Sequence, residues 1–178
     1  WSCNFDSEEE LAGWTQSSGA QWYLTTEPYS QDVPTFSSIN KESKSSLYHA
    51  YTREYCDDVL TSPLISIPNE ATLSFWAVYN PVWIRDQDLT LYVVDQDNLD
   101  MVWSAKADEM NNNTDDPNWN EYSVSLAKYA GKNIQLAWRF EGTFGDDIMV
   151  DDMKITYKSE EAVKNAIIKV DESVHFTD

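Results

Sequence analysis

Positively charged side chains are scarce in this sequence. Its 178 residues include 12 Lys and Arg against 31 Asp and Glu, so the formal net charge is -19 at pH 7. A chain of this sign repels the phosphates of nucleic acids and of anionic membrane surfaces. We therefore expect neither nucleic acid nor an anionic membrane as a partner.

Long apolar runs and cysteines are scarce as well. No run approaches the roughly 18 apolar residues of a membrane-spanning helix, so no span is expected. Cys3 and Cys56 are the two cysteines; they can form one disulfide or stay as two buried thiols, and spacing does not decide. The chain begins at Trp1 rather than Met, from which we expect that a leader, an anchor or an upstream segment has been removed. Secretion is compatible with this expectation.

Motifs of common catalytic sites are missing too. The two histidines, His49 and His175, form no His-Glu-x-x-His motif, and no Gly-x-Ser-x-Gly nucleophile turn occurs. A glycosidase built on a β-sandwich needs two carboxylates across a cleft, and the Glu-x-Asp-x-x-Glu pattern of laminarinase-type enzymes is absent. We therefore expect a protein that is not an enzyme.

Short alternating segments rich in aromatic and apolar residues are abundant. Alternation with a period of two is typical of β-strands, and turn residues separate the segments. Strands at this spacing, with hardly any helical pattern, predict an all-β fold, an antiparallel sandwich of two sheets. The expected strands are 1–7, 21–24, 47–52, 59–67, 71–79, 89–94, 101–105, 119–126, 134–140 and 145–157.

Polar stretches separate these strands. Residues 25–46 predict a long surface excursion, and residues 106–118 a mobile loop. The six residues 95–100 give the plainest hairpin signal. We expect one domain over residues 1–157, followed at 158–178 by an extension or a linker to a further domain.

The last predicted strand contains an unusual aspartate. Alternation places Asp151 on one face with Met149, Met153 and Ile155. An unpaired carboxylate among large apolar side chains costs several kcal/mol. We therefore expect Asp151 to have a cation, a cluster of hydrogen-bond donors or a proton; backbone N–H groups, Arg139 and Lys154 are the alternatives to a metal.

Aromatic side chains are numerous, with 8 Trp and 10 Tyr, and both types are common where one side packs and the other meets a ligand. Four of them lie in or beside predicted loops, where a ring can stack on a sugar or on a partner's side chain; these candidates are Trp22, Tyr23, Tyr29 and Trp83. The alternative is that tryptophans fill the space between the sheets; those considered for this role are Trp14, Trp22, Trp76 and Trp103.

Seven separated pieces of sequence, in this order, resemble MAM domains and the related bacterial cleaved-adhesin domains of haemagglutinin and gingipain type. They lie between about residues 3 and 157 and are 3–6 (Cys-Asn-Phe-Asp), 13–16 (Gly-Trp-Thr-Gln), 61–65 (Thr-Ser-Pro-Leu-Ile), 73–76 (Leu-Ser-Phe-Trp), 102–104 (Val-Trp-Ser), 119–122 (Trp-Asn-Glu-Tyr) and 145–153 (Gly-Asp-Asp-Ile-Met-Val-Asp-Asp-Met).

The resemblance implies a jelly-roll β-sandwich, a secreted or cell-surface location, and an adhesive role within a longer protein. It also implies a calcium ion between the first and last strands, held by Asp6, Asp151 and Asp152. Two departures are present: Ala12 stands where MAM domains usually have a second cysteine, and residues 17–21 lack the acidic residues that both families usually have before the next Trp.

Taken together, these observations favour a non-catalytic extracellular recognition or adhesion module. Its expected partner is a glycan or a host or surface protein, and calcium is expected to stabilise it. A structural spacer that binds nothing is the alternative from another class, and a carbohydrate-active enzyme is the third.

Overall fold

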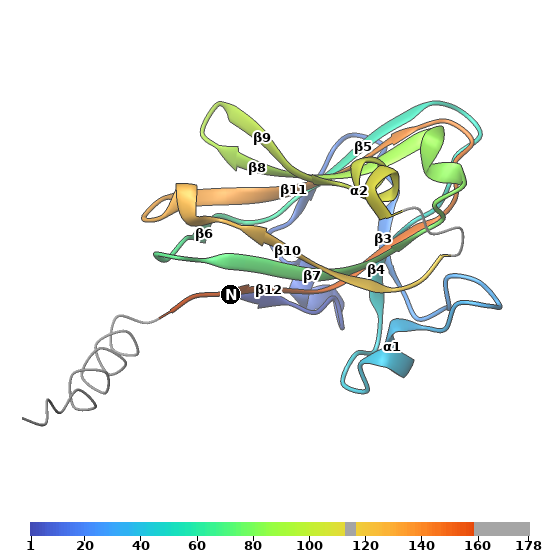
Figure 1. Ribbon diagram of the computed structural model, residues 1–178, viewed down its shortest axis with the longest axis horizontal. Helices are drawn as coiled ribbons and strands as arrows, with labels where there is room; N and C mark the ends of the chain where they lie inside the picture. Colours follow the sequence, from blue (N-terminus) through green and yellow to red (C-terminus); the bar gives the residue numbers. More distant parts are fainter. Residues whose placement is uncertain (113–116, 159–178) are drawn as a thin grey trace, which may run out of the picture.

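The computed structural model describes residues 1–112 and 117–158, and within these residues two antiparallel six-stranded sheets face each other (Figure 1). The predicted all-β jelly-roll sandwich is confirmed. Sheet A has the order β10 (Asn120–Ser125), β7 (Thr72–Tyr79), β12 (Ile148–Thr156), β4 (Ser46–His49) and β3 (Trp22–Thr25), with β1 (Ser2–Cys3) paired to β12. Sheet B has the order β2 (Thr15–Gln16), β5 (Cys56–Thr61), β11 (Asn133–Gly142), β8 (Gln87–Asp95) and β9 (Asn98–Ser104), with β6 (Ile65–Ser66) paired to β11.

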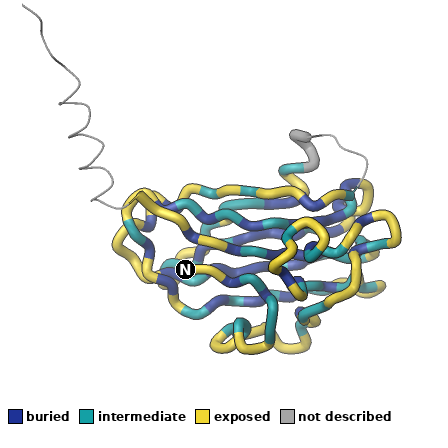
Figure 2. Tube along the Cα trace, turned by 90° about the horizontal axis from the view of Figure 1, so that it is seen from below, coloured by how far each residue is buried: buried dark blue, intermediate teal, exposed yellow. Residues whose placement is uncertain are grey.

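The main core lies between the two sheets. Figure 2 shows buried residues along the strands and exposed ones in the loops. Aromatic rings occupy its centre: Phe75 of sheet A meets Trp138 of sheet B edge-on, with ring centroids 5.0 Å apart. Trp103 packs against both rings, so its predicted role in the core is confirmed.

The predicted loop at 106–118 begins instead with helix α2 (Ala105–Asn112). Ser104 explains why a helix starts here, because its Oγ accepts a hydrogen bond from the backbone N–H of Ala107 at 3.1 Å, as an N-cap does. Good helix-forming residues, Ala-Lys-Ala, follow Ser104. Likewise, the single strand expected at 59–67 is divided into β5 and β6, since Pro63 has no N–H for a sheet.

A β-bulge in β12 changes which face its side chains occupy. The register with β7 shifts between Asp151 and Lys154, and Asp152 has a left-handed φ of 52°. A bulge adds one residue to one strand and so reverses the alternation beyond it. Ile148, Val150, Met153 and Ile155 all lie in the main core. The expectation that Asp151 shares a face with Met153 and Ile155 is therefore wrong.

The predicted surface excursion at 25–46 covers the outer face of sheet A. It contains the short helix α1 (Phe36–Ile39), which lies beneath the lower layer in Figure 1. The segment and sheet A together form a second apolar cluster. Its buried members are Tyr29, Val33 and Phe36 of the segment, Val78 and Met149 of the sheet, and Trp119, which directly precedes β10. Trp76 packs on this cluster rather than in the main core, which corrects its predicted position.

Three short 3-10 helices, η1 (Glu8–Leu11), η2 (Trp83–Arg85) and η3 (Ala127–Tyr129), complete the described elements. Cys3 and Cys56 are free thiols, one buried and one half-buried, so the two-thiol alternative is the one observed. Burial raises the pKa of Cys3 to about 12. Among the described residues, no helix has the length and apolarity to cross a membrane.

Candidate functional site

Three loops join at the right-hand end of the sandwich in Figure 1. They are residues 50–55 between β4 and β5, residues 80–86 between β7 and β8, and residues 143–147 between β11 and β12. The backbone N–H of Phe144 donates to the carbonyl of Thr52 at 3.0 Å, and that of Thr143 donates to the carbonyl of Asp86 at 3.1 Å. The loop at 143–147 therefore lies between the other two, and the three form one continuous surface, which we call the loop surface.

Asp146 and Asp147, which follow the first residue of the last predicted strand, hold these loops together. Asp146 Oδ2 accepts a hydrogen bond from Asn80 Nδ2 at 2.9 Å. Its carbonyl oxygen accepts another from Gln87 Nε2 at 2.7 Å. Asp147 Oδ1 accepts a bond from the backbone N–H of Tyr51 at 3.0 Å. Each acid thus ties the middle loop to one of its neighbours.

Two glycines let the middle loop sit directly on β8. Gln87 is buried, with 2% of its surface exposed. A Cβ on Gly145 would overlap the amide of Gln87, and a Cβ on Gly142 would overlap the Gln87 backbone. Glycine is therefore required at both positions for close approach, and the loop surface rests on a tightly packed base.

Four aromatic side chains are exposed on the loop surface. The exposed fractions are 45% for Tyr51, 63% for Tyr55, 48% for Trp83 and 59% for Phe144. Phe144 has a left-handed φ of 54°, which is rare for a bulky residue and costs about 1–3 kcal/mol. Strained residues of this kind cluster at ligand-binding sites. Phe5 has a similar φ of 53° but is buried, so the strain at Phe144 together with the exposed rings makes the loop surface the candidate site.

The four predicted aromatic ligands divide into two pairs. Trp83 lies on the loop surface. Tyr23 is also exposed, on the edge strand β3, where its ring packs 4.8 Å from that of Tyr48. Trp22 and Tyr29 are buried, so neither ring is available to a ligand. Trp22 lies between the sheets, as the alternative expectation for it requires. Tyr29 belongs to the segment that covers sheet A and is buried in the second apolar cluster.

Sequence reasoning missed three of the four loop aromatics. Tyr51 was included in a predicted strand, whereas β4 ends at His49. Tyr55 and Phe144 lie in breaks between strands, and their position beside turn residues was the one available signal.

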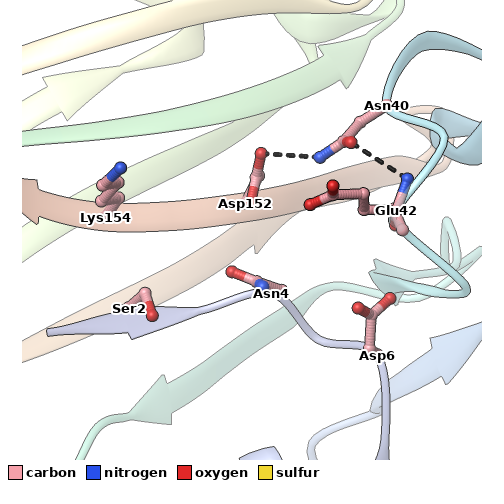
Figure 3. A pocket seen from close by; sticks show the side chains of 8 residues that line it. Ser2, Asn4, Asp6, Asn40, Glu42, Asp152 and Lys154 are labelled. Carbon is pink, nitrogen blue, oxygen red and sulfur yellow. Dashed lines mark hydrogen bonds between the residues drawn. The ribbon is translucent and has the colours of Figure 1, made fainter.

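Two of the three predicted metal ligands, Asp6 and Asp152, line a second feature, an open hollow of about 300 Å³ near the N-terminus (Figure 3). Its lining is polar throughout and consists of Ser2, Asn4, Asp6, Asn40, Glu42, Ser43, Asp152 and Lys154. Asp152 Oδ2 accepts a hydrogen bond from Asn40 Nδ2 at 3.0 Å, and Asp6 accepts one from the backbone N–H of Lys44. The structure thus brings Asp6 and Asp152 to one hollow.

Asp151 does not line this hollow. It is fully buried; its Oδ2 accepts hydrogen bonds from Ser46 Oγ at 2.7 Å and Ser43 Oγ at 3.1 Å, and its Oδ1 accepts one from the Asp152 N–H at 2.6 Å. A cation, a cluster of hydrogen-bond donors and a proton are the expected ways to accommodate this carboxylate. The structure shows the cluster of donors. Burial raises the pKa of Asp151 to about 7, although these three hydrogen bonds act in the opposite direction.

The hollow has donor atoms of the type that calcium binds, but these atoms are not arranged as a calcium site. Calcium takes six to eight oxygen ligands at about 2.3–2.6 Å, and the carboxylates of Asp6, Glu42 and Asp152 are oxygen donors of the right chemistry. Among the described residues, however, no group of three or more His, Cys, Asp or Glu side chains is close enough to hold a metal ion. Calcium would have to draw these three acids together.

The fold defines a class: a two-sheet β-sandwich that is shared by cleaved-adhesin domains and a carbohydrate-binding module. The K1 cleaved-adhesin domain of Lys-gingipain from Porphyromonas gingivalis W83 has a TM-score of 0.60 and 17% identity, over 89% of this chain and 98% of that domain. The K2 domain of Lys-gingipain has a TM-score of 0.59 and 14% identity, over 88% and 99%. TmCBM61, solved in complex with β-1,4-galactotriose, has a TM-score of 0.57 and 15% identity, over 88% and 95%.

No protein-family model and no curated protein matches the sequence. The predicted resemblance to cleaved-adhesin domains is confirmed, and at these identities it shows the shared fold.

Proposed function

We propose that this chain is a non-catalytic recognition module that binds glycans through its loop surface. The observation that carries the proposal is the set of four exposed aromatic rings on loops fastened together by Asp146 and Asp147. Aromatic side chains supply rigid contact area, and a site that is already ordered loses little conformational entropy on binding. The apolar faces of a sugar ring suit such a surface.

The comparisons support a glycan as the ligand. TmCBM61, which has the same fold, was solved with β-1,4-galactotriose bound. The adhesin domains that share the fold belong to a gingipain, and this supports our proposal that the chain acts outside the cell as one module of a longer protein. A protein partner is the competing outcome of the test below.

The absence of catalysis is part of the proposal. Asp146 and Asp147 are the acids in the middle of the loop surface, and both are engaged in holding the loops. A general acid or base has to reach the substrate and exchange a proton with it. Carboxylates whose hydrogen bonds maintain the loop structure are poorly placed for this work.

Calcium is a separate proposal. The ion would be held by Asp6, Glu42 and Asp152 at the hollow, and its effect would be to fasten the segment after β1 and the segment after α1 to β12. Asp151 would not bind the ion itself; it would support the site by holding the backbone N–H of Asp152.

A glycan array followed by calorimetry tests the main proposal. We expect the wild type to bind at least one neutral glycan, and Trp83→Ala and Phe144→Ala to weaken that binding about tenfold or more, as loss of a central aromatic anchor does. Leu99→Ala is the matched control, since Leu99 is 67% exposed and lies next to the β8–β9 turn, at the opposite end of sheet B. Binding of no glycan, or an equal loss in the control, would refute the proposal.

A further inference from the structure

Tyr55 connects the loop surface to the outer face of sheet B. Its hydroxyl donates to Glu141 Oε1 at 2.7 Å, and Glu141 lies near the end of β11, next to the loop at 143–147. Its ring is 63% exposed. A ligand that covers this ring can therefore reach both the loops and the sheet.

An ordered set of charged groups continues from Tyr55 along the sheet. Arg139 Nε and Nη2 donate to the two oxygens of Asp57 at 2.6 and 2.9 Å, and Arg139 Nη1 lies 2.8 Å from Glu141 Oε2. The forked pairing with Arg139 lowers the pKa of Asp57. We call Tyr55, Asp57, Arg139 and Glu141 the polar ladder.

The ladder is accessible as well as ordered. The exposed fractions of its side chains are 41% for Asp57, 29% for Arg139 and 39% for Glu141. Asp57 and Glu141 are directly opposite each other on β5 and β11, where like charges are unfavourable, and Arg139 holds them in place. Ion pairs as exposed as these add only about 0–1 kcal/mol to the free energy of unfolding. A contribution to stability therefore does little to explain why these charged groups are arranged in this way.

Ordered carboxylates and a guanidinium suit sugar hydroxyls. Each carboxylate oxygen keeps a second lone pair to accept from a hydroxyl, and a guanidinium donates in fixed directions. Two carboxylates against one arginine leave the ladder with a net negative charge, in a chain of net charge -19. This balance disfavours sulfated and uronic-acid glycans and leaves neutral ones.

Resting on the proposed function, we infer that the polar ladder is a second subsite, which hydrogen-bonds the hydroxyls of a neutral oligosaccharide whose adjacent sugar stacks on the loop aromatics. The ligand is then an extended chain of several sugars. Affinity therefore rises with chain length.

Calorimetry with neutral β-1,4-linked galacto-, xylo- and gluco-oligosaccharides of two to six sugars tests this inference. The wild type gains affinity with length in at least one series. Arg139→Gln and Tyr55→Phe lose that gain, about tenfold for the longest ligand, and Arg139→Gln keeps the affinity for the shortest. Tyr55→Phe removes one hydroxyl from an exposed ring and so leaves folding intact. Lys132→Gln, which breaks the ion pair with Asp95 near the β8–β9 turn, is the control and keeps the gain.

The possible results distinguish a failure of the second subsite from a failure of the proposed function. Binding whose dependence on length is unchanged in Arg139→Gln and Tyr55→Phe overturns the subsite and leaves the loop surface standing. A preference for polygalacturonate or heparin over the neutral series also overturns it. No binding by any oligosaccharide, or binding unaffected by Trp83→Ala and Phe144→Ala, overturns the proposed function and the subsite with it.

Discussion

Ser46 Oγ donates a hydrogen bond of 2.7 Å to Asp151 Oδ2, across the neighbouring strands β4 and β12, where the carboxylate has no exposed surface. Ser43 and the N–H of Asp152 supply the other donors. Among the described residues no ion pair involves Asp151; Arg139, one of its expected partners, pairs with Asp57 and Glu141. A buried acid with three neutral donors and no cation has consequences for stability.

The first prediction concerns pH. Burial raises the pKa of Asp151 from 3.8 to about 7, so the folded state holds this proton more tightly than the unfolded state. The resulting stabilisation is complete below about pH 4 and is lost as the pH rises to about 7, at most roughly 4 kcal/mol. Urea unfolding between pH 4 and 8 measures it. Asp151→Asn should remove this part of the pH dependence, whereas Asp97→Asn should keep it; equal slopes in wild type and Asp151→Asn would contradict the assignment.

The second prediction concerns the donors. Ser46→Ala removes the shorter hydroxyl bond to Asp151 and leaves a buried oxygen with one donor fewer, which costs about 1–3 kcal/mol. The loss should grow as the pH rises, because the ionised carboxylate needs the donor more. Urea titrations at pH 5 and 8 check this, with Ser66→Ala as an exposed control. A loss that is the same at both pH values would show that Ser46 acts by packing alone.

Most of the strands could be predicted from the sequence. The prediction failed where one inserted residue changes the strand register. Alternation in residues such as Leu73, Phe75 and Ala77 is a local signal, and these residues do lie in the core. The face of Asp151 depends on the bulge at Asp152, which alternation cannot reveal. Asp151 is nevertheless buried, as expected, and the hydroxyls of Ser43 and Ser46 donate hydrogen bonds to its carboxylate.

The candidate site was predictable only in part, for a different reason. The loop position of Trp83 can be predicted from the residues next to it in the sequence. The burial of Tyr29 depends on residues 26–45 folding back over sheet A, a long-range contact that polar composition conceals. The exposure of Tyr51 and Phe144 follows from loops that meet through Asp146 and Asp147, which are distant in sequence from two of those loops.

The third prediction tests the base of the loop surface. Gly145→Ala places a methyl group where the amide of Gln87 lies, so either the loop or β8 has to move. We expect a loss of about 1–3 kcal/mol in the free energy of unfolding and weaker glycan binding. In a Gln87→Ala background the same change should cost less, because the overlapping amide is gone. Equal costs in the two backgrounds would place the effect elsewhere.

The last prediction concerns calcium at the hollow. Because no described group of three acids is already assembled there, binding has to draw Asp6, Glu42 and Asp152 together, and we expect millimolar rather than submicromolar affinity. The melting temperature should then rise on adding millimolar calcium and return with EDTA. Asp152→Asn should abolish the rise, and Asp95→Asn, at the β8–β9 hairpin, should preserve it. A wild-type melting temperature that is identical in calcium and in chelator would remove calcium from the account and leave Ser43, Ser46 and the Asp152 amide as what holds the buried acid.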